Sequence, residues 1–171
     1  HAKLIIAGFA KIFGHTVGTQ FKNIGQPYDD SAAVFGLRLA PALAGALIPA
    51  LVAVLIWQIG GSLWAGFLCG FALCFDNAMY VQSTIIALDS ILISAFLLSM
   101  IFAVRSTDLK SRHHFIYWMI LSGICSGITV GTKFTGLTSI GAALGLWFLL
   151  TLVSKDLEKS QKFKKVFVGG M

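Results

Sequence analysis

Four charged side chains occur within or beside strongly apolar stretches of this sequence, where charge is costly. They are Arg38, Asp76, Asp89 and Lys133. A charged group at the centre of a membrane helix costs roughly 2.5–3.5 kcal/mol, and it usually faces a partner charge or a binding site. A guanidinium can hold a phosphate through two parallel hydrogen bonds. These residues therefore predict a polar cavity for an anionic headgroup, with a purely structural ion-pair cluster as the alternative.

The remaining polar groups narrow the chemistry of this cavity. Asn77 and Gln82 add amide donors and acceptors close to the charges. The chain has no Walker loop, no GxGxxG, no HExxH and no GxSxG, and its three cysteines lack metal-ligand spacing. We therefore predict no metal site among these residues and no cofactor. A phospholipid-like or polyprenyl-phosphate ligand, entering from the bilayer, fits the charges best.

Composition indicates that membrane helices must position these residues. Of the 171 residues, 57% are hydrophobic and only 12% are charged, whereas a soluble domain has about 25% charged residues. A membrane-spanning helix needs roughly 20 mostly apolar residues. The predicted fold is therefore an all-α membrane protein, a polytopic helical bundle. Its five expected spans are 34–59, 63–81, 85–104, 115–131 and 134–153.

Basic residues predict the orientation of this bundle. Eight of the 13 Lys and Arg residues lie in segments 105–114 and 155–165, and basic loops favour the cytoplasmic side. Alternating helices then bring the four intramembrane charges to the opposite end. Because the basic segments flank spans, they argue against nucleic-acid binding. His113 and His114 lie in the first segment and are expected to be solvated.

Three regions follow from this topology. Residues 1–33 are expected on the non-cytoplasmic side, as an amphipathic helix lying in the interface, with Lys3 and Lys11 facing headgroups, followed by a surface loop. Residues 34–153 form the five-helix transmembrane bundle. Residues 154–171 are expected to be a cytoplasmic basic loop and the start of a further span. The chain begins without methionine, and we expect it to be part of a longer membrane protein.

Five stretches resemble the protein O-mannosyltransferase family, in the family's order and over nearly the whole chain. The longest resembles the family pattern of an acidic-Asn pair, Gln-Ser-Arg and Leu-Leu-Asp. The five are "KLIIAGFAKIFG", "QFKNIGQPYDD", "LRLAPALAGALIPAL", "FDNAMYVQSTIIALDSILI" and "GTKFTGL".

The resemblance implies a membrane-embedded glycosyltransferase of the C type in the endoplasmic reticulum. It would move mannose from dolichyl-phosphate mannose to Ser or Thr hydroxyls of secretory proteins, with a homologous subunit as a dimer partner. Arg38 matches the family arginine near the lipid phosphate. Gln82, Asp89 and Lys133 match polar positions of the lumenal face, and Asp76 and Asn77 match the acidic-Asn pair.

Departures from the family keep alternatives open. The family's catalytic carboxylates lie in a lumenal loop upstream of the position of His1, so we expect the present segment to be inactive alone. Thr84 stands where the family has arginine, and Phe134 stands where it has tryptophan. A non-catalytic partner subunit of the same family is the first alternative. A polytopic transporter is the second, although the sequence shows no second half with paired broken helices.

Overall fold

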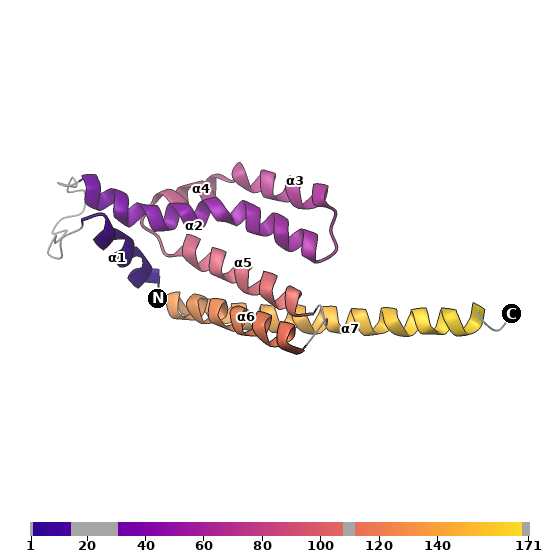
Figure 1. Cartoon of the computed structure of the whole chain (residues 1–171). Coiled ribbons are helices and arrows are strands. Elements are labelled where there is room, and N and C mark those ends of the chain that lie inside the picture. Colours follow the sequence, from indigo (N-terminus) through magenta and orange to yellow (C-terminus); the bar gives the residue numbers. More distant parts are fainter. Residues whose placement is uncertain (1, 15–30, 108–111, 169–171) are drawn as a thin grey trace.

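The computed structural model describes residues 2–14, 31–107 and 112–168, and at 31–33, 112 and 154–168 it describes the backbone alone. The expected loop at 16–30 lies outside these residues. Every described element is helical (Figure 1). The elements are α1 (Ala2–Ile12), α2 (Ser31–Gln58), α3 (Leu63–Cys74), α4 (Asn77–Thr84), α5 (Asp89–Ser106), α6 (Arg112–Thr132), the 3-10 turn η1 (Phe134–Gly136) and α7 (Leu137–Val168).

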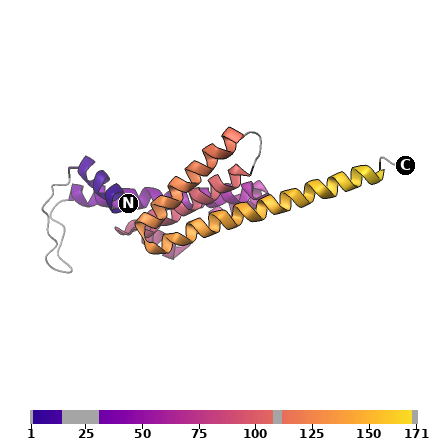
Figure 2. The ribbon, with the colours of Figure 1, turned by 90° about the horizontal axis from the view of Figure 1, so that it is seen from below.

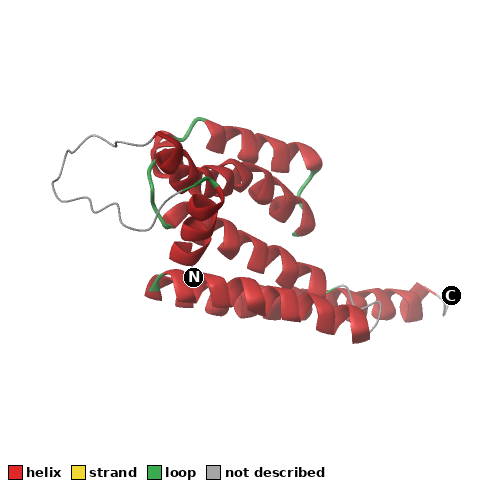
Figure 3. Ribbon diagram, turned by 60° about the vertical axis from the view of Figure 1, so that its left-hand side comes forward, coloured by secondary structure: helices red, strands yellow, loops and turns green. Residues whose placement is uncertain are grey.

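Helix α5 is the centre of the bundle. It packs against α2, α6 and α7. Figure 1 shows it between the α2–α3 pair and the α6–α7 pair, and Figure 3 shows the same all-helical bundle from a second side. Eleven of its 18 residues are buried, and four of these are serines. Small side chains let neighbouring backbones approach closely, which is the main source of helix packing within a membrane.

Within the described residues, four helices are long and apolar enough to cross a membrane, and the bent pair α3–α4 makes a fifth if it counts as one span. The pair was expected as one continuous helix over 63–81. Instead the chain bends by 63° between α3 and α4. The cause is Asp76, whose carboxylate accepts hydrogen bonds from the amides of Ala78 (2.9 Å) and Met79 (3.5 Å). This N-cap starts a new helix.

Helix α7 also differs from expectation, because the basic segment 155–165 continues as helix to Val168. Figures 1 and 2 show it extending well beyond the other helices. The segment "KDLEKSQKFKK" contains neither Gly nor Pro, and five of its 11 residues are Lys, which favours helix. The high charge density of segment 155–165 therefore did not indicate a loop, because the backbone there is helical.

Two glycines bring α3 into direct contact with α2. A Cβ added to Gly66 would lie 2.6 Å from the carbonyl oxygen of Ala53, and one added to Gly70 would lie 2.6 Å from that of Pro49. Glycines four residues apart are typical of close membrane helix crossings. This contact fixes α3, and so the start of α4, against the second half of α2.

Candidate functional site

The site is built around one ion pair that joins helices far apart in sequence. The Lys133 Nζ lies 2.9 Å from the Asp89 Oδ1 and donates a hydrogen bond to it. Asp89 is the first residue of α5, where a carboxylate is favoured by the helix dipole. Lys133 has extended backbone in the turn after α6. Their side chains are 37% and 54% exposed, so an incoming ligand can reach both groups.

Arg38 lies at the same end of the bundle as this pair. It is exposed near the start of α2. Its neighbours on α2, Leu37 and Ala40, pack in one apolar cluster with Leu88 and Ile91 of the α5 region. Leu88 directly precedes Asp89, so Arg38 and the ion pair belong to segments that pack in one cluster. Arg38 and Lys133 therefore lie at the same end of the bundle, and their joint binding of one ligand stays a prediction.

The other carboxylate lies elsewhere. Asp76 caps α4 and lines a cavity of about 470 Å³ against α2, together with Pro49 and Tyr80. On α2 this cavity is lined from Ala42 to Pro49, which is about 6–16 Å along the helix axis from Arg38 at 1.5 Å per residue. The structure therefore does not assemble the expected group of four charges. It holds one ion pair and Arg38 at the end of the bundle, and Asp76 farther along α2.

The two amide residues lie on α4. Asn77 is its exposed first residue, and Gln82 is half-buried. Their helix is close to α2, because a Cβ on Gly45 would lie 2.3 Å from the Cβ of Ser83. Both amides follow the cap set by Asp76. The structure thus places Asp76, Asn77 and Gln82 on one short segment, separate from the Asp89–Lys133 pair.

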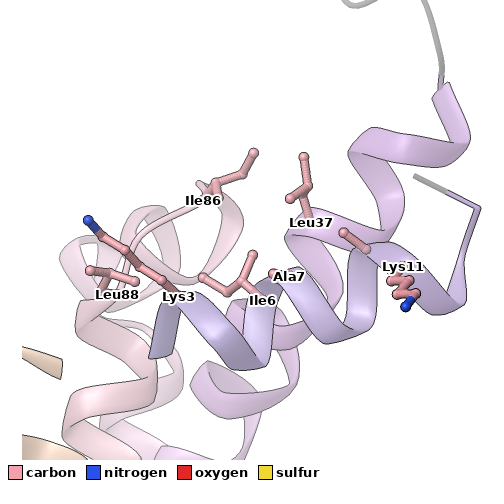
Figure 4. Close-up of a pocket in the computed structure, with 8 residues that line it drawn as sticks. Lys3, Ile6, Ala7, Lys11, Leu37, Ile86 and Leu88 are labelled. Atoms are coloured by element: carbon pink, nitrogen blue, oxygen red, sulfur yellow. The ribbon is translucent and has the colours of Figure 1, made fainter. Parts of the chain in front are cut away.

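An apolar groove next to the ion pair was not foreseen from the sequence. It measures about 650 Å³ and lies between α1, α2 and the segment before α5. In Figure 4 the side chains of Ile6, Leu37, Ile86 and Leu88 border one hollow, and Lys3 lies at its Leu88 side. Because Leu88 adjoins Asp89, the groove leads towards the charged groups.

The packing of α1 forms one wall of this groove. The predicted helix is present, and its buried residues are Ala2, Ile6 and Ala10. The signal for this face in the sequence is the four-residue spacing of Ala2, Ile6 and Ala10. In the structure Lys3 and Lys11 border the groove.

The described residues contain no group of three or more His, Cys, Asp or Glu side chains suited to a metal ion. The charged groups considered at this end of the bundle are Arg38, Lys133 and Asp89. Two cations with amine and guanidinium donors suit a phosphate, and a carboxylate can accept a hydrogen bond from a hydroxyl. Together with the apolar groove, these groups suit a lipid that carries a phosphate.

Comparisons with known proteins find similarity to curated mannosyltransferases. The chain is 28% identical over 156 residues to protein O-mannosyltransferase 1 of Drosophila melanogaster, covering 86% of this chain and 17% of the relative. It is 31% identical over 158 residues to dolichyl-phosphate-mannose–protein mannosyltransferase 4 of Schizosaccharomyces pombe, covering 86% and 20%. Human protein O-mannosyl-transferase 1 is 27% identical over 159 residues, covering 88% and 21%.

The chain thus spans about a fifth of the length of these curated relatives. No solved structure matches it significantly. A family model described as dolichyl-phosphate-mannose-protein mannosyltransferase matches residues 1–168, nearly the whole chain. The resemblance of its motifs is therefore confirmed, and the chain belongs to the dolichyl-phosphate-mannose–protein mannosyltransferase family.

Proposed function

We propose that the full-length protein transfers mannose from dolichyl-phosphate mannose to Ser or Thr hydroxyls of secretory proteins, in the endoplasmic reticulum membrane. The present chain would supply the donor-side part of the site. The observation that carries this proposal is the position of the Asp89–Lys133 pair beside an apolar groove and on the same end of the bundle as Arg38. Family membership supports the reaction class.

In this proposal the groove holds the first part of the polyprenyl chain, and the cations hold the phosphate. The acceptor hydroxyl attacks the anomeric carbon while the bond from that carbon to the phosphate oxygen breaks. The hydroxyl proton passes to a carboxylate expected in the protein upstream of His1, and dolichyl phosphate leaves. Arg38 and Lys133 stabilise the negative charge that grows on the leaving phosphate, which is commonly the largest catalytic term.

Arg38→Ala in the full-length protein tests the proposal. We expect mannose transfer to fall by roughly tenfold or more, because one guanidinium–phosphate interaction is lost as charge develops. Arg38→Lys should retain part of the activity, since it keeps the charge without the planar fork. Transfer is measured with dolichyl-phosphate mannose and a Ser/Thr-rich peptide, at matched membrane expression. His113→Gln, at the other end of the bundle, is the control, and wild-type transfer by Arg38→Ala would refute the assignment.

A second candidate is a non-catalytic partner subunit of the same family. The observation that favours it is Thr84, which replaces an arginine of the family pattern. Its hydroxyl donates to the carbonyl oxygen of Val81 at 3.0 Å and so is bound to its own helix. If the full-length protein transfers mannose only when a homologous subunit with an intact site is co-expressed, and Arg38→Ala leaves that transfer unchanged, this second function is correct.

A further inference from the structure

A polar and aromatic cavity lies at the opposite end of the bundle from the Asp89–Lys133 pair. It measures about 600 Å³, within the range of about 300–1,000 Å³ that is usual for ligand sites. The ends of α2 and α5 and the start of α6 enclose it. Its polar and aromatic lining residues are Trp57, Gln58, Arg105, Thr107, His114 and Trp118.

The Arg105 guanidinium in this cavity is held in a fixed orientation. When the Gln58 amide takes the orientation that satisfies both its ends, its oxygen accepts a hydrogen bond from the Arg105 Nε at 3.0 Å. In that orientation its nitrogen donates to the carbonyl oxygen of Ile101 at 3.1 Å. The guanidinium carbon lies 5.1 Å from the centre of the Trp118 ring. These contacts use the Nε edge and one face of the group. They do not use the pair of terminal nitrogens that forms an end-on bidentate contact with phosphate.

The aromatic wall of the cavity is also fixed. The Trp118 Nε1 donates a hydrogen bond to the His114 Nε2 at 2.8 Å, which holds the two rings together. His114 is half-buried, which differs from its expected solvation. Two indole rings at the end of a membrane bundle suit the interface between hydrocarbon and headgroups. The cavity therefore opens at headgroup depth.

The charge of the cavity selects an anion. Arg105 is the one cationic side chain among its described lining residues, and none of them is a carboxylate. The sequence places the basic segments 105–114 and 155–165 at this same side of the membrane. Basic pockets between membrane helices bind anionic lipid headgroups. A preoriented guanidinium with an aromatic wall suits a phosphate better than a flexible lysine would, because less side-chain entropy is lost.

We propose that this cavity binds the phosphate of an anionic phospholipid headgroup from the leaflet on the basic side of the membrane. A soluble phosphate ester offers the same chemistry and is the source to be distinguished from a lipid. This site is separate from the proposed donor site, because Arg105 and Lys133 lie at opposite ends of the bundle. It would anchor the ends of α2, α5 and α6 to one leaflet.

The test uses the full-length protein in phosphatidylcholine nanodiscs at physiological salt, which screens general surface attraction. The readouts are the lipids retained after purification, by native mass spectrometry, and the shift of the melting temperature when phosphatidylserine is added. We expect wild type and His113→Gln to retain phosphatidylserine and to be stabilised by it. Arg105→Gln should retain phosphatidylserine roughly tenfold more weakly. A tenfold change corresponds to about 1.4 kcal/mol, close to the contribution of one charge-assisted hydrogen bond.

The outcomes distinguish a lipid headgroup from a soluble phosphate, and they test whether the cavity binds phosphate through Arg105. A shift with phosphatidylserine but none with inorganic phosphate assigns the lipid headgroup, whereas a shift with inorganic phosphate alone assigns a soluble phosphate. Unchanged retention in Arg105→Gln overturns the site. If that variant does not fold, Arg105→Lys decides, because it keeps the charge. Several-fold weaker retention supports the guanidinium–phosphate contact, and wild-type retention by Arg105→Lys overturns it.

Discussion

At the scale of single residues, the Asp89–Lys133 pair shows how a charge is tolerated at the end of a membrane bundle. The two groups are 2.9 Å apart and both keep substantial exposure. Neither needs full desolvation, so the pair avoids most of the penalty of a buried ion pair. The same exposure makes each group accessible to a ligand. The Asp89–Lys133 pair is therefore stable without a ligand and still accessible to one.

Removing one member of this pair should cost more than removing both. Lys133→Gln leaves the Asp89 carboxylate unpaired, whereas the double variant Asp89→Asn with Lys133→Gln leaves two neutral amides. We expect a coupling free energy of about 0.5–1 kcal/mol, in the upper range for exposed pairs. Unfolding of the four proteins of this cycle in detergent measures it. Strictly additive losses would mean that the pair contributes nothing to stability.

The residue types predicted part of the site, but they did not predict that Asp76 lies apart from the other three charged residues. Arg38, Asp89 and Lys133 could be assigned to one end of the bundle, because alternation of spans fixes the level of each residue. Asp76 was assigned to that end on the assumption of a straight helix. Its carboxylate instead caps α4, and a choice between capping and ligand binding depends on local backbone geometry. The groove beside α1 depends on tertiary packing that no local pattern encodes.

At the scale of elements, hydroxyl groups and glycines set how α5, α6 and α7 pack. Each buried polar side chain among the described residues is a Ser or a Thr. The Ser122 hydroxyl donates to the carbonyl oxygen of Ser99 at 2.9 Å, joining α6 to α5. The Thr129 and Ser139 hydroxyls lie 2.5 Å apart, joining α6 to α7. These bonds satisfy polar groups in an environment that offers no water.

Gly136 is the position at which this packing is most sensitive. An added Cβ would lie 2.2 Å from the carbonyl oxygen of Thr129, and backbone cannot move aside as a flexible side chain can. We expect Gly136→Ala to destabilise the protein by about 1–3 kcal/mol, as overpacking does. Gly141→Ala is the matched control, because beyond its own stretch of helix no atom among the described residues lies within 4 Å of its Cβ position.

This control substitution should be neutral or stabilising by up to about 1 kcal/mol, since Ala favours helix over Gly. Unfolding of both variants by denaturing detergent measures the difference. Equal stabilities of Gly136→Ala and Gly141→Ala would show that the turn after α6 is looser than the structure indicates.

The positions of the long helices were predictable, whereas their breaks and extensions were not. Hydropathy located α2, α5, α6 and the apolar part of α7 to within a few residues, because apolar composition over about 20 residues is a strong signal. The α3–α4 bend depends on a single capping carboxylate among apolar neighbours. The helical continuation of α7 depends on helix propensity, which hydropathy does not measure.

At the scale of the whole molecule, the two ends of the bundle differ in chemistry. One end has the exposed ion pair, Arg38 and an apolar groove, and the other has Arg105 with indole rings around a polar cavity. The basic segments predict that the Arg105 end is cytoplasmic. A lipid-linked sugar and a leaflet phospholipid would then be bound from opposite sides of one bundle.

Cysteine labelling in sealed microsomes tests this orientation. In a background without Cys69, Cys74 and Cys125, we expect Ile59→Cys to react with an impermeant maleimide added outside, because it lies at the Arg105 end. Phe134→Cys, which is 83% exposed beside Lys133, should react only after the membrane is permeabilised. The reverse pattern would invert the topology, and the donor site would then face the cytoplasm.

The Thr129–Ser139 contact has a consequence for how this protein is made. The two hydroxyls are only ten residues apart in sequence, so they meet as soon as the turn between α6 and α7 has formed. The α6–α7 hairpin can therefore satisfy these two polar groups with its own side chains, without a hydrogen bond from α5. Within a membrane, this spares the hairpin the cost of carrying two unpaired hydroxyls.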